Sequence, residues 1–278
     1  MTSERAAADV AARDVAAGDV AAGERDTGTG PRQVVSLVLP APGRVGLVAG
    51  GVVGVLALLG AAAAFTRATG AAFSGSEGLV ALFHLDSEFN VPAIVSVLGL
   101  AACGGLLLLV GACLRATDHR DARRWHWLGV GFLYLALDEG ARIHERANAV
   151  VNQWGIPLDI LRFGWVVLGA AAVIALVPVY LPAVLRLPGD LRWLAIVSAV
   201  LFVGGAIGME MVGATLYERG VDDAGYQTAV LVEESAEMAG VALFLTTLWA
   251  WWRRVTARTL LVHAGASTGG DASVADPV

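Results

Sequence analysis

Long hydrophobic runs, each bounded by charged residues, fill the middle of the chain. The six helices that they predict cover 45–66, 89–114, 125–151, 163–185, 193–217 and 225–252. The first, second and fourth runs contain no charged residue, and each exceeds the ~20 residues that a helix needs to cross a hydrocarbon layer of ~30 Å. The other three reach this length only with acidic residues inside them. The pattern predicts an all-α integral membrane bundle of six transmembrane helices.

The two ends of the chain lack such runs. Residues 1–30 contain a repeat with a period of five, seen in DVAARDVAAGDVAAG. A period of five matches neither a helix nor a strand, so it places no apolar stripe on one face. We expect disordered cytoplasmic tails at 1–30 and 264–278, and a transmembrane domain over 31–263 between them.

Arginine in the loops predicts how the helices are oriented. Arginine is concentrated between the second and third runs, between the fourth and fifth, and after the sixth. Because arginine near the end of a span is retained in the cytoplasm, these ends should lie inside. Tryptophan gathers at the same ends, where indole rings favour the membrane interface. We therefore predict a multi-pass protein of the cell membrane with both termini in the cytoplasm.

Composition agrees with a membrane location and excludes nucleic acid as a partner. The chain is 56% hydrophobic and 16% charged, whereas a soluble domain is ~25% charged. Its 19 basic residues are all arginine, and 25 acidic residues give a net charge of −6. Such a chain offers no basic surface for a nucleic-acid backbone. The predicted partner is the lipid bilayer.

Glycines spaced by four residues occur on two of the predicted helices. Gly46, Gly50 and Gly54 lie on the first helix, and Gly204 and Gly208 lie on the fifth. Small residues at this spacing let two helices approach closely. We expect them to pack helices inside the chain or to join two copies as a homo-oligomer.

Seven carboxylates inside the three interrupted spans are the most unusual feature of the sequence. They are Asp138, Glu139, Glu145, Glu210, Glu233, Glu234 and Glu237. Near the bilayer centre a charged side chain costs about 2.5–3.5 kcal/mol, so such residues normally face the bundle interior. Counted from the predicted outer helix ends, all seven lie in the outer half of the membrane. With Arg142 and Arg146 as the cations at that depth, five negative charges remain without a balancing charge.

Carboxylates and one imidazole form a hard ligand set that suits Mn, Fe or, less typically, Zn. We predict a divalent metal site with the ligands Asp138, His144, Glu145, Glu233 and Glu237. The predicted acid–base groups beside it are Glu139, Glu210 and Glu234. The sequence has neither a Glu-x-x-His nor a His-Glu-x-x-His motif to support this site. A water-filled proton or cation pathway and a structural polar network remain open alternatives.

These residues suggest a metal-dependent membrane enzyme acting on a lipid-like substrate. The alternatives are a proton- or cation-coupled transporter and a non-catalytic membrane scaffold. His84, Asp86 and Glu88 lie just before the second span. The two acids could stabilise the start of that helix, or all three residues could cover the site from outside.

Three short motifs accompany these residues: D-x-E-x-N-x-P at 86–92, L-D-E-x-x-x-I-H-E at 137–145 and E-E-x-x-E-M at 233–238. In them the chain resembles a group of uncharacterised bacterial multi-pass membrane proteins. The resemblance extends over about 45–253. It implies the helical membrane fold, with these acids as its signature, and it implies no activity.

Overall fold

The computed structural model describes residues 34–71, 73–87, 89–144, 146, 164–217, 220–221, 223–256 and 259–263. Strands β1 (Val34–Val38) and β2 (Thr259–His263) pair in a two-stranded sheet. All the helices described below belong to one compact unit, Val38–Leu260, called the helical unit.

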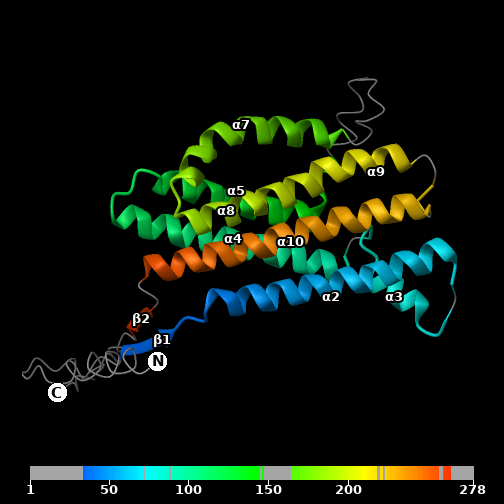
Figure 1. The fold of residues 1–278 in the computed structure, drawn as a ribbon, viewed down its shortest axis with the longest axis horizontal. Coiled ribbons are helices and arrows are strands. Elements are labelled where there is room, and N and C mark those ends of the chain that lie inside the picture. The colour runs from blue at the N-terminus through cyan, green and yellow to red at the C-terminus, as the bar shows by residue number, and fades with distance from the viewer. Residues whose placement is uncertain are drawn as a thin grey trace, which may run out of the picture. The chain divides into compact units, whose positions relative to one another are not determined.

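The helical unit consists of helices that pack side by side (Figure 1). They are α2 (Pro42–Thr69), α3 (Ser76–Phe83), α4 (Val91–Ala116), α5 (Ala122–Ala141), α7 (Trp165–Leu185), α8 (Gly189–Val203), the π-helix η2 (Gly204–Met209), α9 (Glu210–Leu216) and α10 (Ala224–Val255). Among the described residues, four helical segments are long and apolar enough to cross a membrane: α2, α4, α7 and the continuous run of α8, η2 and α9. The prediction of a helical bundle is confirmed for this unit, while six spans and the orientation of the termini stay predictions.

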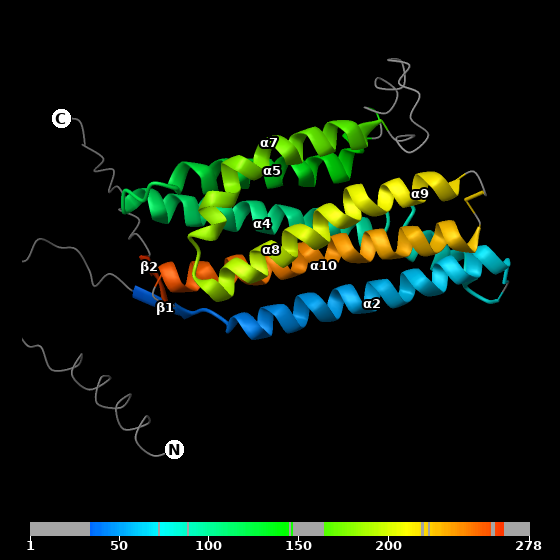
Figure 2. The same ribbon diagram turned by 45° about the horizontal axis from the view of Figure 1, so that its top comes forward.

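Helix α10 lies at the centre of the helical unit and contacts α2, α4, α8 and η2 (Figure 2). Small residues make these close contacts possible. A methyl group at Gly240 would come within 2.9 Å of the backbone oxygen of Ser198 on α8. Gly104 on α4 and Gly129 on α5 each face the other's backbone at a similar distance. These close helix contacts therefore occur at glycines other than those predicted from the four-residue spacing.

Several helix ends lie together at one side of the helical unit and are joined there by side-chain contacts. We call this side the arginine end. The carboxylate of Asp121, before α5, accepts hydrogen bonds from Arg186 at the end of α7. The indole of Trp249 on α10 donates to the carbonyl oxygen of Pro40, just before α2, at 2.9 Å. Further contacts at this end are the Arg254–Asp190 ion pair and the edge-to-face Trp125–Trp251 pair. The helix ends that the arginine pattern placed on one side thus lie together.

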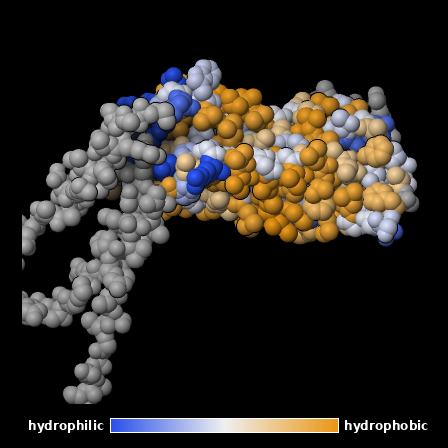
Figure 3. Space-filling view, turned by 60° about the horizontal axis from the view of Figure 1, so that its bottom comes forward, coloured by the Kyte–Doolittle hydropathy of each residue, from blue (hydrophilic) through white to orange (hydrophobic). Residues whose placement is uncertain are grey.

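Large hydrophobic side chains cover the outside of the helical unit. Leu47 is 78% exposed, Leu58 is 73% exposed and Ile174 is 75% exposed. Figure 3 shows hydrophobic residues spread over one face, with hydrophilic residues gathered toward its ends. Soluble proteins rarely expose apolar patches of this extent. The surface is suited to contact with membrane lipid.

The predicted helix over 125–151 is interrupted at Arg142: α5 ends at Ala141, residues 143, 144 and 146 are helical again, and residues 145 and 147–151 lie outside the described residues. Arg142 adopts a left-handed backbone conformation with φ 56°, which a non-glycine residue rarely adopts within a helix. One carboxylate oxygen of Asp138 then accepts the backbone N–H of His144 at 2.8 Å. The side chain thus takes over a role that the helix backbone would have played.

Candidate functional site

Carboxyl groups from three parts of the fold approach one another on one side of α10. We call the set Asp138, Glu139, Glu210, Glu233, Glu234 and Glu237 the acid cluster. Glu233 and Glu237 lie four residues apart on α10, and Glu210 is the first residue of α9. The carboxyl groups of Glu210 and Glu233 lie close enough to interact directly. Because an ionised carboxylate can only accept, a hydrogen bond between them requires a proton on one of the two.

The π-helix η2 sets the position of Glu210. It ends at Met209, immediately before Glu210, and packs against α10. A π-helix widens the turn, which changes the direction of the residues that follow, and it often occurs at functional sites. The sequence analysis did not identify this element. Its only signal is the glycine-rich composition of 204–208.

Gly205 permits the close approach of η2 and α10. A methyl group at this position would lie 2.8 Å from Cγ of Glu237 and 2.9 Å from the backbone oxygen of Glu233. The glycines predicted to pack on this helix, Gly204 and Gly208, would meet nothing within 4 Å. In the described part of the chain, the close packing of η2 against α10 therefore depends on Gly205, which lies between the two glycines that the sequence predicted.

Asp138, a member of the acid cluster, forms a pair with His144. The Nδ1 atom of His144 lies 3.1 Å from a carboxylate oxygen of Asp138. The imidazole ring also packs against the indole of Trp165, with 5.3 Å between ring centroids. Trp165 donates from Nε1 to Glu210 at 3.1 Å. This indole, which the sequence analysis missed, joins the pair on the α5 side to the carboxyl groups of α9 and α10.

Glu139 links α5 to α10 and borders an opening in the surface. Its carboxyl group lies within electrostatic range of Asp138, His144 and Glu237. It also lines a pocket of about 260 Å³ whose other walls are Phe89, just before α4, and apolar residues of α4 and α5, Ile94 among them. The acid cluster therefore has a carboxyl group at an otherwise apolar pocket.

A second polar group lies at the opposite side of the helical unit from the arginine end, around the start of α4. The hydroxyl of Tyr226 donates to Asp86 at 3.1 Å. Burial raises the pKa of Asp86, although the Tyr226 hydrogen bond and the charges of His84 and Arg67 oppose this shift. The negative charge of Glu210 also acts on Asp86 in the raising direction. Asp86 is thus coupled electrostatically to the acid cluster.

His84 is held by neutral partners on both ring nitrogens. Its side chain is 1% exposed, and Nε2 lies 2.7 Å from Oε1 of Gln227. Gln227 donates from Nε2 to Val221, so its Oε1 is the acceptor for His84. The Nδ1 atom lies 3.0 Å from the hydroxyl of Ser87. These contacts make His84 a structural residue that ties the loop before α4 to α10.

The start of α4 is capped by Asn90. Its Oδ1 accepts the backbone N–H of Ala93 at 3.0 Å, and its Nδ2 donates to the carbonyl oxygens of His84 and Ser87. Asn90 therefore supplies the side-chain cap of α4, while the carboxylate of Asp86 accepts a hydrogen bond from Tyr226. Glu88 lies outside the described residues.

The predicted metal ligands are only partly brought together. Asp138 and His144 are in contact, Glu233 and Glu237 share one helix, and Glu145 lies outside the described residues. Within the ranges that the structure describes, no group of three or more His, Cys, Asp or Glu side chains is arranged to hold a metal ion. The metal site stays a prediction.

The fold and the site define a class: a helical protein with membrane-length apolar helices and a central group of carboxyl side chains. The chain belongs to the family described as Domain of unknown function (DUF8692), whose model matches residues 48–252. That stretch contains all six members of the acid cluster. Comparisons with curated proteins and with solved structures gave no match.

Proposed function

We propose that this chain is a multi-pass integral membrane protein whose acid cluster binds and releases protons, as the site of a proton-coupled transporter does. The proposal includes six spans and cytoplasmic termini. In this arrangement α5 and α10 cross the membrane beside the four more apolar segments. Their acidic residues would then be shielded from lipid inside the bundle.

The close approach of Glu210 and Glu233 carries the proposal. It brings together two carboxyl groups from different helices, which can share one proton in a hydrogen bond. Loss of that proton leaves two like charges, which at 4 Å repel by about 4 kcal/mol for an effective dielectric constant of about 20. Such a change is large enough to alter the contact between α9 and α10. A proton can thereby be coupled to a movement of helices.

A second candidate is the metal-dependent membrane enzyme that acts on a lipid-like substrate. The 3.1 Å distance between His144 Nδ1 and a carboxylate oxygen of Asp138 supports it, because two of the predicted ligands lie side by side. The ligands would be Asp138, His144, Glu145, Glu233 and Glu237, holding Fe, Mn or Zn. Glu139, Glu210 and Glu234 would supply acid–base groups.

The test compares wild-type protein with Glu233→Gln, which keeps the side-chain shape and removes the exchangeable proton. Glu77→Gln is the matched control, because Glu77 is an exposed glutamate on α3 outside the acid cluster. We expect infrared pH titration to reveal a protonated carboxyl band that only Glu233→Gln removes. Proteoliposomes containing a pH-sensitive dye should show proton flux that the same variant reduces at least tenfold.

Metal analysis of the same samples separates the two candidates. Stoichiometric metal in the wild type, lost in Glu233→Gln, together with absent proton flux, would replace the transport proposal by the enzyme. Absence of both signals, with a lowered unfolding temperature of Glu233→Gln, would refute the proposal in favour of a scaffold.

A further inference from the structure

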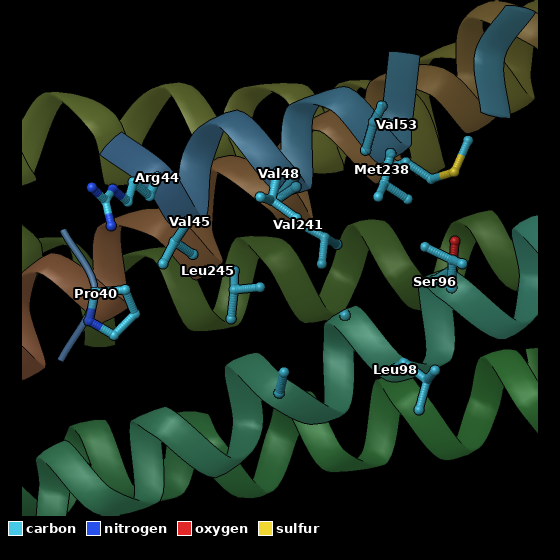
Figure 4. Close-up of a pocket in the computed structure, with 16 residues that line it drawn as sticks. Pro40, Arg44, Val45, Val48, Val53, Ser96, Leu98, Met238, Val241 and Leu245 are labelled. Carbon is cyan, nitrogen blue, oxygen red and sulfur yellow. The ribbon is translucent and has the colours of Figure 1, made fainter. Parts of the chain in front are cut away.

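An apolar groove runs between α2, α4 and α10, on the outside of the helical unit (Figure 4). Its volume is about 520 Å³. The walls include Val48 and Val53 of α2, Leu98 and Ala102 of α4, and Val241 and Leu245 of α10. Along α2 the lining extends from Arg44 to Val53, which corresponds to about 14 Å at ~1.5 Å per residue. The groove has the elongated, apolar character that suits a hydrocarbon chain.

One end of the groove carries a positive charge. Arg44 and Pro40 lie together there, and the other labelled side chains follow along the groove (Figure 4). Arg44 is exposed and belongs to the first turn of α2, where a cation opposes the helix dipole. Among the described residues it forms no ion pair. Its charge therefore does not serve the stability of its own helix.

The surroundings of Arg44 resemble a membrane interface. Pro40 accepts a hydrogen bond from the indole of Trp249, and tryptophan favours the headgroup region of a bilayer. The arginine end described above contains this contact. An apolar groove that begins beside a cation at headgroup level matches the two parts of a phospholipid: a phosphate at the surface and a chain below it.

We propose that the groove binds one acyl chain of an anionic phospholipid whose phosphate group pairs with Arg44. Charge complementarity selects this occupant. In a zwitterionic lipid the phosphate is partly neutralised by its own amine, so the attraction to the guanidinium is weaker. The attraction between an anionic lipid and Arg44 should be about as strong as the attraction of one basic residue to a negatively charged membrane surface. The proposal concerns lipid binding alone and is independent of the protonation of the acid cluster.

The test measures lipid binding to the purified full chain by native mass spectrometry. Phosphatidylglycerol and phosphatidylcholine are titrated separately onto wild type, Arg44→Gln and the control Arg123→Gln. Arg123 is an exposed arginine in the first turn of α5, at the same arginine end. We expect wild type to prefer phosphatidylglycerol, and Arg44→Gln to bind it about fivefold more weakly. Arg123→Gln should bind as wild type does.

A second variant tests the groove itself. Ala102 is exposed on α4 and lines the groove, so Ala102→Phe fills the space without disturbing the core. It should remove the most tightly bound lipid while the chain keeps its unfolding temperature. Equal binding of both lipids by wild type and Arg44→Gln would overturn the proposal. A dimer of the wild type that Ala102→Phe dissociates would also overturn it, because a second copy would then occupy the groove.

Discussion

Replacing Gly205 by alanine tests whether close packing of η2 against α10 positions the acid cluster. The added methyl group would lie 2.8 Å from Cγ of Glu237 and 2.9 Å from the backbone oxygen of Glu233. Two carbon atoms attract best at about 3.5–4.0 Å. Because one of the two neighbours belongs to the backbone of α10, a change of rotamer cannot relieve the contact. The two helices must separate by several tenths of an ångström.

The expected cost follows from two opposing contributions. Overpacking a well-packed contact destabilises a protein by about 1–3 kcal/mol. Alanine also favours a helix over glycine by up to about 1 kcal/mol. Gly204→Ala is the matched control, since a methyl group there meets nothing within 4 Å and only the helix-favouring contribution applies. The difference between the two variants should therefore be about 1–3 kcal/mol.

Thermal unfolding in detergent measures this difference. For a chain of this size each kcal/mol shifts the unfolding temperature by about 2–4 °C, so Gly205→Ala should unfold several degrees below Gly204→Ala. The infrared carboxyl band of the Glu210–Glu233 pair should change in the first variant alone. Equal unfolding temperatures and unchanged bands in both variants would refute the reasoning that Gly205 sets the distance between the helices.

Two further predictions concern polar groups outside the acid cluster. Asp121→Asn should destabilise the protein by about 3 kcal/mol at neutral pH, measured by thermal unfolding against Asp118→Asn, because Asp121 is 1% exposed and binds two arginines. Hydrogen bonds from Arg186 hold the pKa of Asp121 below its ordinary value of ~3.9. This stabilisation is therefore fully present above that value and is lost as the pH falls through the pKa of the folded state. The unfolding temperatures of Asp121→Asn and Asp118→Asn should converge in acid. A difference between them that does not change with pH would contradict the ion pair. Tyr226→Phe removes the hydrogen bond to Asp86 and should raise the pKa of Asp86 further, measured by infrared titration with Asp86→Asn to assign the band.

Helix positions were predictable where hydrophobic length alone decides them. The run at 163–185 contains no charge, and α7 covers Trp165–Leu185. The end of α5 was not predictable in this way, because it depends on a contact across six residues between Asp138 and the backbone of His144. Hydrophobic periodicity reports which residues avoid water. It does not report when a side chain displaces a backbone hydrogen bond.

The candidate site was predictable in its residue types and only partly in its contacts. Spacing placed Glu233 and Glu237 on one face of one helix, as in α10. The close approach of Glu210 and Glu233 required the direction of α9, which the π-helix before it determines. The link through Trp165 required the packing of α7 against α5 and η2. Such contacts arise from tertiary structure, and no single segment encodes them.

The arginine end and the acid cluster are stabilised by different interactions. At the arginine end, Asp121 is bound by Arg124 and Arg186, so opposite charges hold the helix ends together. In the acid cluster the carboxyl groups of Glu210 on α9 and Glu233 on α10 lie close together, and under the proposed function they share one proton. Loss of this proton turns an attraction into a repulsion of about 4 kcal/mol, whereas the ion pairs at the arginine end are unaffected at neutral pH. A change in protonation should therefore separate α9 from α10 near Glu233, with the arginine end as the fixed point of the movement.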